Sequence, residues 1–134
     1  MGLRERRAIK AFEDTQWPEL KAQILDAAGA PIPIEVDWAS LAAEGYADDY
    51  AESLPKLYFL PLIQAFKNVA FDDLGKEAVR EGIARIIIQN KAQGYSSWWV
   101  NLQDKVLTLD HYYSNIDDVE GRTEVLQKKL ENQL

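Results

Sequence analysis

The stretch ARIIIQN, residues 84–90, carries the strongest strand signal in the chain. Its three consecutive isoleucines, Ile86 to Ile88, are β-branched and favour extended structure. They do not alternate with polar residues, which is typical of a central strand whose two faces are at least partly covered. We therefore expect this strand to lie inside a sheet that helices shelter.

Two more strand patterns follow, SSWWVNLQ (residues 96–103) and KVLTLDHY (residues 105–112), joined by a turn around Gln103 and Asp104. Consecutive strands with short turns favour antiparallel pairing. Upstream, residues 34–38 alternate apolar and acidic side chains after two prolines, which is typical of a strand at a sheet edge. The sequence therefore predicts a small antiparallel sheet, a three-strand meander plus one edge strand.

Helical spacing of apolar residues fills the remaining segments. The patterns cover residues 3–14, 17–28, 40–52, 55–70, 72–81 and about 115–134. The first two are two helices or one helix bent at Pro18, and Pro61 either kinks one helix or divides two. Asp72 or Asp73 is expected to cap the 72–81 helix, and Ser114 or Asn115 the last one. We expect a single α+β domain over residues 1–134 with about five helices.

Composition excludes several functions. The chain has no cysteine, which rules out disulfides, thiolate metal sites and cysteine nucleophiles. Its net charge of −7 argues against binding nucleic acid, because such binding depends on cations that neutralise phosphate. The start of the chain has no signal-peptide pattern, and the apolar stretch LYFLPLIQAF is too short to span a bilayer. We therefore expect a cytosolic protein without membrane contact.

Negative charge is concentrated in residues 35–55, which hold six acids and no base. Tyr46 and Tyr50 are four residues apart and would share one face of a helix there. An acidic surface with embedded aromatic rings suits a basic protein partner, although it also describes an ordinary solvated helix. The residues expected to form this face are Asp37, Trp38, Tyr46, Asp48, Asp49, Tyr50 and Trp98.

Trp98 is included because neighbouring residues on a strand point to opposite faces, so that either Trp98 or Trp99 should point outward. An exposed tryptophan is a natural anchor for a partner, and the alternative is that helices bury both rings. The leading hypothesis is a non-enzymatic protein that binds another protein, in the manner of an inhibitor or immunity protein. Self-association as a homodimer, through the final helix or a sheet edge, is a further possibility.

The alternative is a small hydrolase-type enzyme built on His111, the only histidine in the chain. A nearby carboxylate would orient it, and Tyr112 or Tyr113 would act as an acid. Asp110 is adjacent on the predicted strand, however, so its side chain should diverge from His111. No nucleophile motif accompanies the histidine. The bland interpretation is a histidine at a strand end that bonds a loop carbonyl.

Metal and cofactor binding are not expected. Three aspartate pairs, at residues 48–49, 72–73 and 117–118, lack the spacing of a calcium loop, and two of them fall where helices start. The lone Gly75-Lys76 lacks the remainder of a phosphate-binding loop. A third hypothesis is a protein that encloses a small ligand in a cavity, for which the aromatic content is mild support.

Overall fold

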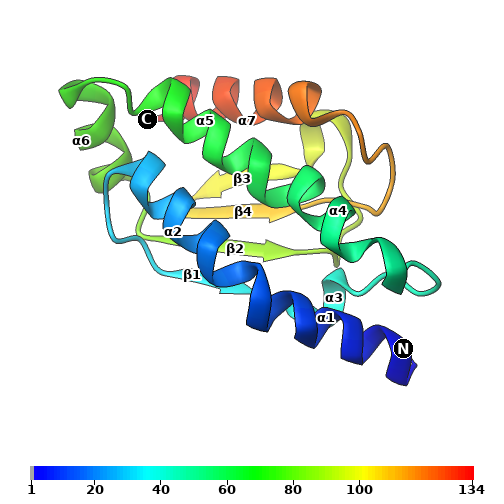
Figure 1. The fold of residues 1–134 in the computed structure, drawn as a ribbon. Coiled ribbons are helices and arrows are strands. Elements are labelled where there is room, and N and C mark those ends of the chain that lie inside the picture. The colour runs from blue at the N-terminus through cyan, green and yellow to red at the C-terminus, as the bar shows by residue number, and fades with distance from the viewer. Residues whose placement is uncertain (1) are drawn as a thin grey trace.

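The structure, a computed structural model, describes residues 2–134 as a mixed four-stranded sheet with helices packed over it (Figure 1). The strands are β1 (Ile34–Val36), β2 (Arg85–Gln89), β3 (Val100–Gln103) and β4 (Val106–Asp110). The helices are α1 (Leu3–Thr15), α2 (Trp17–Ala28), α3 (Trp38–Leu41), α4 (Tyr50–Leu54), α5 (Leu60–Val69), α6 (Asp73–Gly82) and α7 (Val119–Gln133). The predicted α+β character is confirmed in this broad sense.

The predicted meander is wrong. The strand order is β1-β2-β4-β3, and β2 pairs in parallel with both β1 and β4. A meander needs a short turn after β2, but residues 90–99 carry the chain past β4 through the short 3-10 helix η3 (Ser96–Trp98). The strand predicted over residues 96–103 therefore begins only at Val100.

The hairpin between β3 and β4 is confirmed as an antiparallel pair. Its turn lies at Asp104 and Lys105, both of which have positive φ angles, of 53° and 63°. Two consecutive left-handed residues match the backbone twist of a two-residue hairpin. β1 is confirmed as an edge strand, although its neighbour is the parallel strand β2.

Only one face of the central strand is deeply buried. Ile86 and Ile88 are fully buried and pair with Leu107 and Leu109 of β4. Ile87, on the opposite face of the strand, is half-buried. The expectation that both faces are at least partly covered is therefore met, with one face buried and the other half-buried. Figure 1 shows α2, α5 and α7 lying side by side over the same side of the strands.

The helix predicted over residues 40–52 does not form. α3 ends at Leu41, and the chain then turns through Gly45, whose φ of 85° is the left-handed conformation that glycine adopts readily. It resumes in the short 3-10 helix η1 (Ala47–Asp49) and in α4. The prediction that Tyr46 and Tyr50 share an exposed helical face is consequently wrong.

Pro61 does not divide its helix, because a π-turn precedes it. α4, the π-helical segment η2 (Pro55–Phe59) and α5 form one continuous helical run, in which the Leu60 amide donates to the Pro55 carbonyl. Counting this run once gives six helices in residues 2–134 rather than about five. The wider turn accommodates a proline, which has no N–H to donate.

Several helix ends are as predicted and one is not. α1 and α2 are separate helices that meet at Gln16, and Gly29 ends α2 with a φ of 70°. Asp72 caps α6, as expected. The final helix is capped by Asp118 rather than by Ser114 or Asn115, because residues 111–118 form an irregular loop. Among residues 2–134, no helix combines the length and apolar character needed to cross a membrane.

Candidate functional site

Two residues of the predicted binding face belong to the core or its border. Tyr50 is only 1% exposed, and its hydroxyl donates to the Ala43 carbonyl at 2.6 Å. Burial raises the pKa of Tyr50 to about 12. Trp38 is half-buried in an aromatic cluster with Phe12, Trp17 and Phe59. These two rings therefore stabilise the fold instead of offering a free surface.

Asp37 has a local structural role. Its carboxylate accepts a hydrogen bond from the Ser40 amide at 3.2 Å and so caps α3. The same carboxylate pairs with Lys91 Nζ at 2.9 Å, and this hydrogen bond lowers the pKa of Asp37. The contact ties the start of α3 to the loop that follows β2.

The other four predicted residues remain at the surface. Tyr46 is 48% exposed, Asp49 is also exposed, and Asp48 pairs with Arg4 of α1. Trp98 is 80% exposed and stacks on Tyr95, with ring centroids 6.3 Å apart, while Trp99 is buried. One tryptophan therefore points outward, but from a 3-10 helix and not from a strand.

Tyr46 and Asp49 lie in a hollow of about 250 Å³ between the α4–η2 helix and the 111–118 loop, which we call the Tyr113 groove. Its main lining residues are Tyr46, Asp49, Glu52, Lys56, Tyr113 and Asp117. The last four come from the helix and loop on either side. Sequence reasoning did not include them in the predicted face, because residues 52–56 and 113–117 are far apart in the chain.

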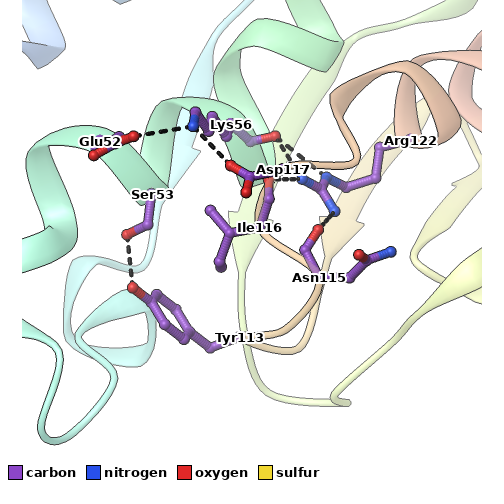
Figure 2. Close-up of polar contacts among 8 residues, drawn as sticks. All are labelled: Glu52, Ser53, Lys56, Tyr113, Asn115, Ile116, Asp117 and Arg122. Atoms are coloured by element: carbon purple, nitrogen blue, oxygen red, sulfur yellow. Dashed lines mark hydrogen bonds and ion pairs between the residues drawn. The ribbon is translucent and has the colours of Figure 1, made fainter.

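Tyr113 is fixed in the groove at both ends of its side chain. Its hydroxyl donates to Ser53 Oγ at 2.8 Å, as Figure 2 shows. Its ring centroid lies 4.6 Å from the ring centroid of Tyr46. Burial raises the pKa of Tyr113, so the phenol stays neutral at physiological pH. The two rings form a short aromatic wall with an exposed edge at Tyr46.

Lys56 lies across the floor of the groove between two acids. Its ammonium is 3.1 Å from Glu52 Oε1 and 2.8 Å from Asp117 Oδ1 (Figure 2). The hydrogen bond with Asp117 raises the pKa of Lys56 and lowers that of Asp117. Asp49 forms no ion pair with residues 2–134, so the groove carries three carboxylates against one ammonium.

Arg122 joins the η2 helix to the 111–118 loop beside the groove. Its Nε and Nη2 donate to the Lys56 carbonyl at 3.2 and 3.1 Å, and Nη1 donates to the Asn115 carbonyl at 2.8 Å (Figure 2). The Lys56 carbonyl is available because the π-turn sends the Leu60 amide to Pro55 and residue 61 is a proline. Arg122 thus satisfies a carbonyl that the helix itself leaves open.

The structure separates His111 from the carboxylate beside it. Asp110 accepts hydrogen bonds from the Lys91 and Ala92 amides at 3.0–3.1 Å and from Gln89 Nε2 at 3.0 Å. The His111 ring instead lies with Nδ1 2.5 Å from the Tyr112 carbonyl. The expected divergence of the two side chains is confirmed, so Asp110 cannot orient His111 for catalysis.

The three aspartate pairs lie apart from one another in roles that can be named. Among residues 2–134, no three histidine, aspartate or glutamate side chains gather closely enough to hold an ion. Two of the three aspartate pairs have other structural roles, since Asp72 and Asp118 cap helices. Asp48 and Asp117 each pair with a cation.

Comparison with known proteins finds no family model, curated protein or solved structure that matches this chain. Two hollows lie beside the 111–118 loop. One is the Tyr113 groove, and the other contains His111.

Proposed function

We propose that this protein binds a second protein and that the Tyr113 groove receives a basic side chain of that partner, an arginine in particular. The observation that carries the proposal is the position of the free Asp49 carboxylate beside the Tyr46–Tyr113 ring pair, of which Tyr46 is exposed. A guanidinium stacks well on an aromatic face and forms paired hydrogen bonds with a carboxylate.

The size of the groove supports a side chain as its occupant. Its volume of about 250 Å³ is below the roughly 300–1,000 Å³ of pockets that enclose a whole small molecule. Interface anchors of this kind are commonly tyrosine and arginine. The net charge of −7 would also steer a basic partner toward the surface.

The groove is complementary to a cation even after Lys56 is counted. Glu52 and Asp117 share that one ammonium, which leaves Asp49 without a counter-charge among residues 2–134. Glu52 and Asp117 are mostly exposed, so an incoming cation would reach them before it displaced Lys56. Complementary charge of this type mainly increases the association rate and the specificity.

A peptide titration tests the proposal. The probe is acetyl-Gly-Arg-Gly-amide, and its counterpart contains citrulline, which has nearly the same shape without the charge. We expect the arginine peptide to shift the ring resonances of Tyr46 and Tyr113 saturably, and high salt to weaken the effect. Equal shifts from the citrulline peptide would contradict the proposal.

Matched variants locate the effect. Asp49→Asn removes the free carboxylate of the groove, and Tyr46→Ala removes its exposed ring. Asp104→Asn removes one charge from the exposed β3–β4 turn and serves as the control. Binding should fall in the first two variants and stay unchanged in the control. An equal loss in Asp49→Asn and Asp104→Asn, with none in Tyr46→Ala, would mean that only net charge matters.

A further inference from the structure

A second hollow lies on the other side of the 111–118 loop, at the carboxyl end of β4 and the first turn of α7. We call it the His111 cavity. Its volume is about 430 Å³, and its chief lining residues are Tyr95, Ser96, His111, Tyr112, Asp118 and Arg122. This volume lies in the range of pockets that bind small molecules, roughly 300–1,000 Å³.

The cavity wall contains a histidine nitrogen that is free to accept a hydrogen bond. His111 is only 3% exposed, and its Nδ1 lies against the Tyr112 carbonyl, so Nδ1 carries the proton. Nε2 is then a lone-pair acceptor, and it accepts no hydrogen bond from residues 2–134. Burial lowers the pKa of His111, which keeps the ring neutral at pH 7. Because His111 lines the cavity, a ligand hydroxyl that enters it can donate a hydrogen bond to this nitrogen.

The charges around the cavity cancel. Arg122 is 4% exposed, and the described residues take four of the hydrogen bonds it can donate, which leaves one Nη1 hydrogen. Asp118 supplies the one carboxylate of the lining. It accepts the Gly121 amide at 3.0 Å and so already occupies the positive end of α7. A cavity with one positive group, one negative group and a capped helix start favours a neutral ligand over an anion.

The mouth of the cavity is aromatic and hydroxylated. Tyr95 and Tyr112 are 61% and 46% exposed, and Tyr95 is held by its stack on Trp98. Ser96 and Ser114 add hydroxyl groups to the lining. The site thus offers aromatic faces for C–H groups, acceptors at His111 and Asp118, and donors at Arg122 and the hydroxyls. Vicinal hydroxyl groups on a small ring satisfy all three demands at once, since each hydroxyl both donates and accepts.

We propose that the His111 cavity binds a neutral polyol of monosaccharide size, with one ligand hydroxyl donating to His111 Nε2. The proposal is independent of protein binding at the Tyr113 groove, because the two hollows have different lining residues. It assigns His111 a binding role and involves no chemical step.

The experiment is an NMR titration that follows the imidazole nitrogens of His111. The probes are methyl α-D-glucopyranoside, methyl α-D-galactopyranoside and myo-inositol, with inorganic phosphate as the anionic comparison. At least one polyol should shift the Nε2 resonance saturably, in the direction of a newly accepted hydrogen bond. The two glycosides against inositol distinguish a sugar from a general polyol. The proposal is overturned if no polyol saturates the shift, or if phosphate alone does.

Variants at the cavity mouth keep the test independent of folding. Ser114→Ala and Tyr112→Phe each remove a single hydroxyl from the lining. If one hydrogen bond contributes about 1 kcal/mol, each hydroxyl that contacts the ligand should weaken polyol binding about fivefold when lost. Tyr113→Phe, which removes a hydroxyl from the other groove, should have no effect. Equal binding by wild type, Ser114→Ala and Tyr112→Phe would also overturn the proposal.

Discussion

The two hollows on either side of the 111–118 loop are built in opposite ways. The Tyr113 groove is formed by exposed charges, with Glu52 and Asp117 both more than three-quarters exposed. The His111 cavity instead contains two buried polar side chains, His111 and Arg122, whose partners are main-chain carbonyls. Exposed charges contribute little to stability and remain free to meet a partner, whereas buried polar groups are costly to leave unpaired. One loop therefore has an adaptable side and a rigid side.

Replacing Arg122 should give the largest effect. Arg122→Met would leave the carbonyls of Lys56, Asn115 and Ile116 without their donor, and we expect the free energy of unfolding to fall by about 3 kcal/mol. Urea denaturation measures the loss. Lys128→Met, which removes an exposed i,i+4 pair with Glu124 in the same helix, is the control and should change stability by less than about 0.5 kcal/mol.

A double-mutant cycle sharpens the role of the π-turn. Pro61→Ala would restore an N–H that the Lys56 carbonyl can accept in the π register. Arg122→Met should then cost less in the Pro61→Ala background, with a coupling energy of about 1 kcal/mol. Strict additivity of the two substitutions would show that the arginine does not compensate for the proline.

Two matched tyrosines compare the rigid and adaptable sides directly. The Tyr58 hydroxyl is fully buried and donates to the His111 carbonyl at 2.7 Å, so Tyr58→Phe should lower the free energy of unfolding by about 1–3 kcal/mol. Tyr113→Phe loses only a part-buried bond to Ser53 and should lower it by less than about 1 kcal/mol. Urea denaturation measures both losses. Similar losses in the two variants would contradict the difference between the rigid and the adaptable side of the loop.

The pH dependence of stability tests the burial of His111. Because its pKa is lowered in the folded state, the unfolded chain binds more protons below the ordinary histidine pKa of about 6.5. Stability should be constant above that pH and fall as the pH drops toward 5, by at most about 1.4 kcal/mol per pH unit. Denaturation at pH 5 and 7 should show this fall in wild type but a smaller one in His111→Gln. An identical fall in the variant would assign the effect to other groups.

Among the residues that line the two hollows, the smallest stability change is expected at Lys56. Lys56→Met breaks two exposed ion pairs and should alter the free energy of unfolding by only about 0.5 kcal/mol. The same change makes the Tyr113 groove more negative, so the arginine peptide should bind more tightly than it does to wild type. Weaker peptide binding by Lys56→Met would show that the groove is not a cation site.

Local features of this fold were readable from the sequence, and long-range ones were not. Gly29, the Asp72 cap and the β3–β4 hairpin follow from residue chemistry over a few positions. The placement of β4 beside β2 does not, because nothing in residues 90–99 specifies which strand the next one joins. Periodicity alone could not separate a strand covered on both faces from one with a half-buried residue such as Ile87.

The candidate sites show the same division. The divergence of Asp110 and His111 followed from strand geometry. Arg122 was missed, although it lies four residues before Leu126 and eight before Leu130, on the buried face of α7. A cationic residue on the buried face of a helix indicates that a carbonyl or carboxylate group pairs with it in the interior. The Tyr113 groove had no such signal, because it exists only once residues 46–56 meet the 111–118 loop.

The insertion of β4 between β2 and β3 has a consequence for how the chain can be made. During synthesis from the amino end, β2 emerges with only the three-residue β1 as a neighbour, and its other edge stays open until residues 106–110 follow. α5 likewise lacks α7, its main neighbour among the helices, until the final segment appears. The nascent protein would therefore gain its cooperative stability late, with an open strand edge that chaperones or crowding partners could reach first.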